Sequence, residues 1–306
     1  MNEITLIQFL QEGLPFVESI ASACLGTILT SLFLRGDTAT TEFEKIKAKK
    51  FDEVISDLLA NGKMTYKDLH DCRNFGQIVK YADHCLKTDP TIESDKERTY
   101  EFDWFIRFYE YAGKISNSDM QLLWGKLLAG ELNKPGTVSY SLLHALYMMR
   151  QEDAQIFSNI CRFVLNDING QPHLFLYLTS NPRAYKKRNI TPVSLNNLQR
   201  LGLVVCDFHK EYVFQHEDTN ARDMGIGIRK HFRSGNNYIK VSGTNESNNM
   251  ISVGNAVLTP DGEMLCSIID EDYKRYSGTN LDFIVSMLEE KGCLVQINDT
   301  YTTKFT

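Results

Sequence analysis

Two short stretches of the sequence combine basic and aromatic side chains in the pattern of a phosphate-binding surface. The first stretch surrounds Tyr185 and the second surrounds Phe232. Lys and Arg neutralise phosphates, and a neighbouring aromatic ring can stack on a base. The residues that we expect to bind a nucleotide or an oligonucleotide are Arg183, Lys186, Lys187, Arg188, Arg229, Lys230 and Arg233. The alternative is a solvated surface whose cations pair with the acidic segments of the chain.

Motifs for catalysis or metal binding are missing from the sequence. It contains no phosphate-binding G-x-x-x-x-G-K-[ST], no nucleophile elbow G-x-S-x-G and no zinc motif H-E-x-x-H. His70, Cys72, His84 and Cys85 match no zinc-site spacing. We therefore predict a protein that is not an enzyme and that holds neither a metal nor a cofactor. A hydrolase whose catalytic residues lie far apart in the sequence is the alternative, because catalytic triads need not be contiguous.

Composition limits the function classes further. The chain has 306 residues, of which 42% are hydrophobic and 24% charged, so it can bury an ordinary core. A formal net charge of -6 excludes a generally basic nucleic-acid coat, so any nucleic-acid site must be a local patch. The seven cysteines are scattered without a C-x-x-C pair, which is typical of a reducing compartment.

Residues 16–34 form an apolar segment with Glu18 as its only charge. Its length is close to that of a membrane-crossing helix, and the basic residues that follow it would keep the bulk of the chain in the bacterial cytoplasm, below the inner membrane. Small and hydroxyl side chains recur along one side, where they would let identical helices pack around a pore: Ser19, Ser22, Gly26 and Thr30. The alternative is an amphipathic helix packed on its own domain in a cytoplasmic protein.

The hydrophobic periodicity predicts an α+β protein, with a mainly helical N-terminal two-thirds and a small winged-helix-like C-terminal domain. The aromatic run within 97–114 has helical spacing and is expected to form core rather than a base-stacking platform. We expect four parts: apolar N-terminal helices over 1–36, a helical connector over 37–93, a helical core over 94–168, and an α+β ligand or sensor domain over 169–306.

Three segments of the C-terminal part alternate helix, glycine and strand. The segment 191–205 predicts a helix that ends at Gly202 and enters a strand. In 257–265 a strand should lead into a helix that Thr259 caps. A third unit, 283–297, should turn at Gly292. The first two segments resemble parts of a winged-helix unit.

The helical core carries a pattern of aromatic, glycine and proline residues that resembles bacterial abortive-infection alpha (Abi-alpha) proteins. Its residues are Asp103, Trp104, Arg107, Phe108, Ala112, Ile115, Ser116, Met120, Gln121, Leu123, Trp124, Lys126, Leu128, Ala129, Gly130, Glu131, Pro135 and Gly136. The resemblance extends over about 95–166, and Leu258-Thr259-Pro260-x-Gly262 fits the C-terminal part of those proteins. None of these residues is catalytic.

This resemblance implies a role in defence against phage. The chain would be a homo-oligomeric membrane effector, a pore or membrane-disrupting protein, whose ligand is a nucleotide or an oligonucleotide. Its partners would be further copies of itself, membrane lipid, and a nucleotidyltransferase-like protein that makes the nucleotide or DNA ligand. The rival interpretation is a soluble helical interaction protein whose winged-helix-like domain binds nucleic acid or protein.

Overall fold

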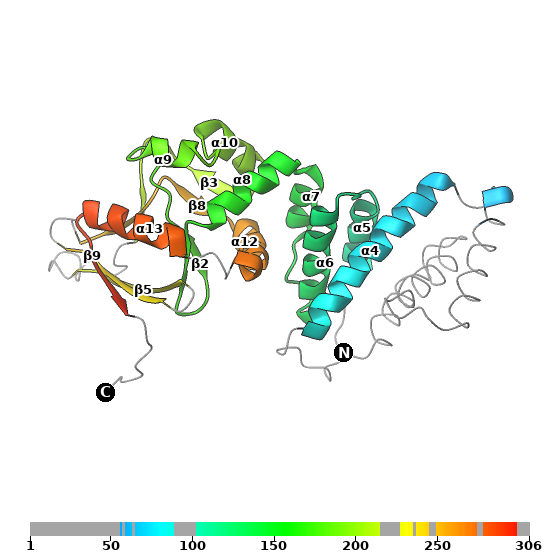
Figure 1. Ribbon diagram of the computed structural model, residues 1–306, viewed down its shortest axis with the longest axis horizontal. Helices are drawn as coiled ribbons and strands as arrows, with labels where there is room; N and C mark the ends of the chain where they lie inside the picture. The colour runs from blue at the N-terminus through cyan, green and yellow to red at the C-terminus, as the bar shows by residue number, and fades with distance from the viewer. Residues whose placement is uncertain are drawn as a thin grey trace. The chain divides into compact units, whose positions relative to one another are not determined.

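The computed structural model describes residues 56, 59–62, 65–88, 102–214, 227–234, 237–244, 249–273 and 278–298 (Figure 1). The chain divides into two compact units, the first ending at Leu143 and the second beginning at His144. The protein mixes helices and strands and is α+β, as the periodicity predicts. The predicted parts 1–36 and most of 37–93 lie outside the described residues.

The first unit contains α4 (Tyr66–Thr88), α5 (Phe102–Ala112), α6 (Ser118–Asn133) and the start of α7 (Tyr140–Met148). Asn117 begins α6, because its side chain accepts hydrogen bonds from the backbone N–H groups of Asp119 and Met120. Gly125 lets α4 pack closely on α6, since a Cβ at this position would lie 2.5 Å from Cβ of Tyr81. Helix packing here depends on the missing side chain.

Aromatic residues fill the core of the first unit, as their spacing predicts. Trp104, Phe108 and Trp124 are buried, and the ring centroids of Phe108 and Trp124 lie 5.2 Å apart. The buried carboxylate of Glu131 accepts hydrogen bonds from the N–H groups of Gly136 and Val138 at 2.6 and 2.8 Å. These residues of the Abi-alpha-like pattern therefore pack helices and hold the α6–α7 loop.

The second unit is built around a five-stranded antiparallel sheet in the order β2-β1-β5-β6-β9. Its strands are β1 (Val164–Asp167), β2 (Pro172–Leu174), β5 (Arg229–Ser234), β6 (Asn237–Ser242) and β9 (Leu294–Asn298). Two short ribbons pair β3 (Val204–Cys206) with β8 (Ala256–Leu258), and β4 (Tyr212–Phe214) with β7 (Ile251–Gly254). The first strand precedes residue 169, so the sheet begins within the range that the sequence assigns to the helical core.

Helices cover one face of this sheet. They are α8 (Gln151–Cys161), α9 (Pro182–Lys186), α10 (Pro192–Arg200), α12 (Pro260–Tyr273) and α13 (Gly278–Glu290). Figure 1 shows α13 on the side of the sheet that faces α9. Phe232, Ile239 and Val241 are buried on this side of β5 and β6. The alternate residues of the same strands point to the opposite face.

The two predicted helix–strand segments form one unit, because β3 pairs with β8 and sets Val204 opposite Leu258. Thr259 accepts a hydrogen bond from Gly262 N at 3.0 Å and so begins α12. A Cβ on Gly262 would overlap the Leu203 carbonyl oxygen. Two of the Leu-Thr-Pro-x-Gly residues are thus fixed by this junction. The third predicted unit is confirmed by α13, Gly292 at a φ of 77° and β9.

Candidate functional site

Strand β5 divides the second basic cluster between the two faces of the sheet. Successive side chains of a strand alternate, so Arg229, His231 and Arg233 share one face while Lys230 and Phe232 share the other. Phe232 is buried, and the Lys230 ammonium lies 5.1 Å from the centre of the Phe214 ring. Of the predicted ligands in this cluster, Arg229 and Arg233 stay together and Lys230 is separated from them.

Neighbouring strands add residues that the sequence analysis missed. In β6, Lys240 lies opposite His231 and Ser242 lies opposite Arg229. In β9, Gln296 lies opposite Lys240. We call the exposed side of β5, β6 and β9 the cationic face; its residues are Arg229, His231, Arg233, Tyr238, Lys240, Ser242, Leu294 and Gln296. The alternation of apolar Ile239 and Val241 with polar neighbours is the sequence signal that could have placed Lys240 here.

The twist of the β5–β6 pair brings residues together along one diagonal. The His231 and Tyr238 rings stack on this diagonal, with centroids 5.5 Å apart and an interplanar angle of 20°. The same diagonal joins Arg229 to Lys240, whose backbones are expected about 7–8 Å apart. A pair of cations therefore lies next to a stacked pair of rings.

The cations of the cationic face are not neutralised within the described part of the chain. Neither Arg229 nor Lys240 has an ion-pair partner there. Burial, followed by the positive charges of Lys240 and Arg229, lowers the pKa of His231. An imidazole between two cations is disfavoured as a third cation, so the local field is positive although the whole chain is acidic.

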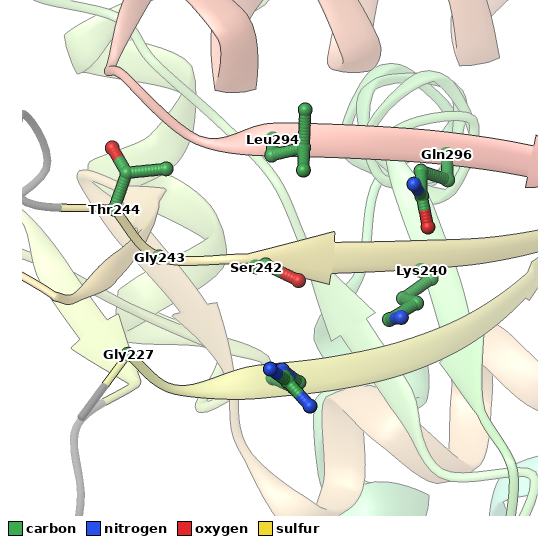
Figure 2. Close-up of a pocket in the computed structure, with 8 residues that line it drawn as sticks. Gly227, Lys240, Ser242, Gly243, Thr244, Leu294 and Gln296 are labelled. Atoms are coloured by element: carbon green, nitrogen blue, oxygen red, sulfur yellow. The ribbon is translucent and has the colours of Figure 1, made fainter.

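A hollow of about 670 Å³ lies at one end of this face. It is lined by Gly227, Arg229, Lys240, Ser242, Gly243, Thr244, Leu294 and Gln296. Figure 2 shows Lys240 and Ser242 on β6 beside Leu294 and Gln296 on β9. Gly227 approaches Gly243 so closely that a Cβ would overlap the Gly243 carbonyl oxygen. This end of the hollow is therefore walled by backbone.

The comparisons with known proteins give one match. A family model described as "Protein of unknown function (DUF2806)" matches residues 60–276, which is more than half of the chain. The chain belongs to the DUF2806 family. No curated protein and no solved structure matches it. The matched range includes β5 and β6 of this DUF2806 protein and ends before β9.

The first basic cluster of the DUF2806 protein has a different environment. Arg183, Lys186 and Lys187 are exposed at α9. Arg188 instead donates to the Ala184 carbonyl and to Asn280, both at 3.3 Å. Tyr185 is buried, and its hydroxyl accepts a hydrogen bond from Tyr177 N at 3.0 Å. Burial raises the pKa of Tyr185, and neither residue is available to stack on or bind a ligand in this arrangement.

The two basic clusters are not brought together. Figure 1 shows α13 between α9 and β5. Phe283 of α13 contacts Tyr185, with ring centroids 5.5 Å apart. Of the seven predicted phosphate ligands, Arg229 and Arg233 therefore lie on the cationic face and the other five lie elsewhere.

The predicted pore residues Ser19, Ser22, Gly26 and Thr30 lie outside the described residues. Among the helices that the structure describes in this DUF2806 chain, none has the length and hydrophobicity needed to cross a membrane.

Proposed function

We propose that this DUF2806 protein binds an oligonucleotide on the cationic face of its sheet. The observation that carries the proposal is the diagonal pair Arg229 and Lys240, which has no carboxylate partner among the described residues. Like charges set close together without a counter-ion are unfavourable, and a bound phosphate would remove that cost. The pair is therefore better suited to an anionic ligand than to supporting the fold.

The arrangement favours a nucleic-acid chain over an isolated anion. Arg229, His231 and Arg233 repeat along β5 at about 6.8 Å, twice the rise of a strand residue. This repeat suits the successive phosphates of an extended single strand. The Tyr238 ring stacked on His231 provides the aromatic surface that bases use on sheets of this kind.

The wider role is proposed from the resemblance to Abi-alpha proteins. The protein would be a homo-oligomeric effector of phage defence at the bacterial inner membrane, in which residues 16–34 form the membrane helix and the cationic face senses the ligand. A ligand can switch such an effector only by binding one state more tightly than the other. Its source would be a nucleotidyltransferase-like partner.

The junction α10–β3–β8–α12 supports a narrower statement about the second unit. A helix enters an antiparallel ribbon through Gly202, and the ribbon leads to a second helix at Thr259. We propose that this part is winged-helix-like. If residues 16–34 do not enter a membrane, the same protein would be a cytoplasmic nucleic-acid-binding scaffold.

Binding is tested by fluorescence anisotropy with a labelled single-stranded oligothymidylate. The variant carries Arg229→Glu and Lys240→Glu, and the matched control is Arg200→Glu, because Arg200 is an exposed arginine at the end of α10. The double variant should lose binding by at least about tenfold, while the control should bind as the wild type does. Equal binding by all three proteins, or loss of binding in the control alone, would contradict the proposal.

The membrane proposal has a separate test. After cell lysis, the full-length chain should sediment with membranes and require detergent for extraction. Replacing Gly26 with Leu should reduce toxicity or oligomer size, because a larger side chain would keep neighbouring helices apart. Recovery of the whole chain in the supernatant without detergent would contradict the membrane proposal and leave oligonucleotide binding unaffected.

A further inference from the structure

We propose that the hollow at the Gly227–Gly243 end of the cationic face binds one phosphorylated nucleotide unit, either a free nucleoside monophosphate or the phosphorylated end of an oligonucleotide. The inference rests on the proposed function and assigns the hollow a ligand class of its own. Its volume of about 670 Å³ falls in the range of pockets that hold small molecules, about 300–1,000 Å³.

The phosphate-binding half of the hollow is formed by β5 and β6. Ser242 lies directly opposite Arg229, and Lys240 completes the group on the same side of β6. In the described part of the chain, none of these three side chains has a hydrogen-bond or ion-pair partner. A terminal phosphate can accept hydrogen bonds from the guanidinium, the ammonium and the hydroxyl together.

The other half is uncharged and suits a nucleobase. Leu294 lies opposite Ser242, and its side chain is 54% exposed. Gln296 lies opposite Lys240 and presents one amide oxygen and one NH₂ group. Figure 2 shows both side chains along β9 beside Ser242 and Lys240. A base lying on Leu294 would exchange hydrogen bonds with Gln296, while its phosphate reaches the cations.

The position of the hollow explains why it should accept an end rather than the middle of a chain. Arg229, Ser242 and Leu294 form the last row of the sheet in this direction. Beyond this row lie Gly227 and Gly243, whose backbones are in contact, and Thr244, whose hydroxyl donates to the Gly292 carbonyl. None of these groups supplies a further cation, so phosphate contacts stop at this row.

The probes are adenosine, adenosine monophosphate, inorganic phosphate, and one oligothymidylate prepared without a terminal phosphate, with a 5′-phosphate and with a 3′-phosphate. We expect adenosine monophosphate to bind at least about tenfold more tightly than adenosine or inorganic phosphate, as measured by calorimetry. One phosphorylated end should bind more tightly than the unphosphorylated oligonucleotide if the ligand is a chain end. If the ligand is a free nucleotide, the three oligonucleotides should bind equally and be displaced by adenosine monophosphate.

Three variants separate the hollow from the rest of the face. Gln296→Ala and Leu294→Ala should each weaken adenosine monophosphate binding several-fold, whereas Val205→Ala, which shortens another exposed apolar strand residue, should not. Binding of adenosine monophosphate that is no tighter than that of phosphate, or that is unchanged in both β9 variants, would overturn the inference. If the oligonucleotide still binds in that case, the proposed function stands; if no nucleic acid binds at all, the proposed function fails as well.

Discussion

Arg229 and Lys230 are adjacent in the sequence, yet the structure predicts opposite consequences for their removal. Arg229 lies on the cationic face beside Lys240, and Lys230 lies on the other face with its ammonium 5.1 Å from the centre of the Phe214 ring. Replacing each with Ala changes the net charge of the protein equally. Any difference in ligand binding between the two variants must therefore come from the face on which the side chain lies.

The size of the effect follows from the contact that is lost. A hydrogen bond to a charged group contributes about 1.5–3 kcal/mol, and the exposure of Arg229 favours the lower end, which corresponds to a loss of about tenfold in affinity. Neutralising one fewer phosphate should also reduce the slope of log K against log salt by about 0.7 for a single strand. Lys230→Ala should leave the slope unchanged and alter the affinity by less than about twofold.

The assay is anisotropy of a labelled oligothymidylate measured across a series of salt concentrations. Thermal unfolding of both variants provides the control, because each should remain folded at the assay temperature. Equal losses of affinity and equal slopes for the two variants would refute the assignment of the ligand to the cationic face. A larger loss for Lys230→Ala would place the ligand on the other side of β5.

Three further predictions concern stability and pH. Gly262→Ala should destabilise the second unit by several kcal/mol in thermal or denaturant unfolding, because its Cβ would overlap the Leu203 carbonyl oxygen, whereas Ser286→Ala on exposed α13 should have little effect. Gly125→Ala should cost about 1–3 kcal/mol by forcing α4 away from α6, and an unchanged unfolding midpoint would contradict the close packing at Tyr81. Oligonucleotide binding should tighten as the pH falls through about 6.5, because burial and the charges of Lys240 and Arg229 lower the pKa of His231 in the free protein and a bound phosphate would raise it. Arg229, Arg233, Tyr238 and Lys240 do not titrate in this range, so His231→Asn should abolish the pH dependence measured by calorimetric proton uptake.

Local signals determined much of the secondary structure. Asn117 and Thr259 begin helices because their side chains accept hydrogen bonds from the first backbone N–H groups. Gly202 and Gly292 end helices because each adopts a positive φ that other residues avoid. These features depend on a few neighbouring residues, so the sequence was sufficient to predict them. The buried aromatic core likewise followed from its helical spacing.

The composition of the candidate site was only partly accessible from the sequence. The period-two alternation of a strand could have separated Lys230 from Arg229 and Arg233, had 229–234 been identified as a strand. The structural role of Arg188 could not have been predicted, because Asn280 and Phe163, which it contacts, lie far away along the chain.

The sequence by itself determined the α+β class, the ends of several helices and the presence of local basic patches in an acidic chain. Only the tertiary structure decided which strands are neighbours, and so brought Lys240 and Gln296 beside Arg229. Helix caps and glycine turns are set by interactions within a few residues. Pairing between strands is set by burial of one face of the sheet and by contacts between distant segments, which no local pattern specifies.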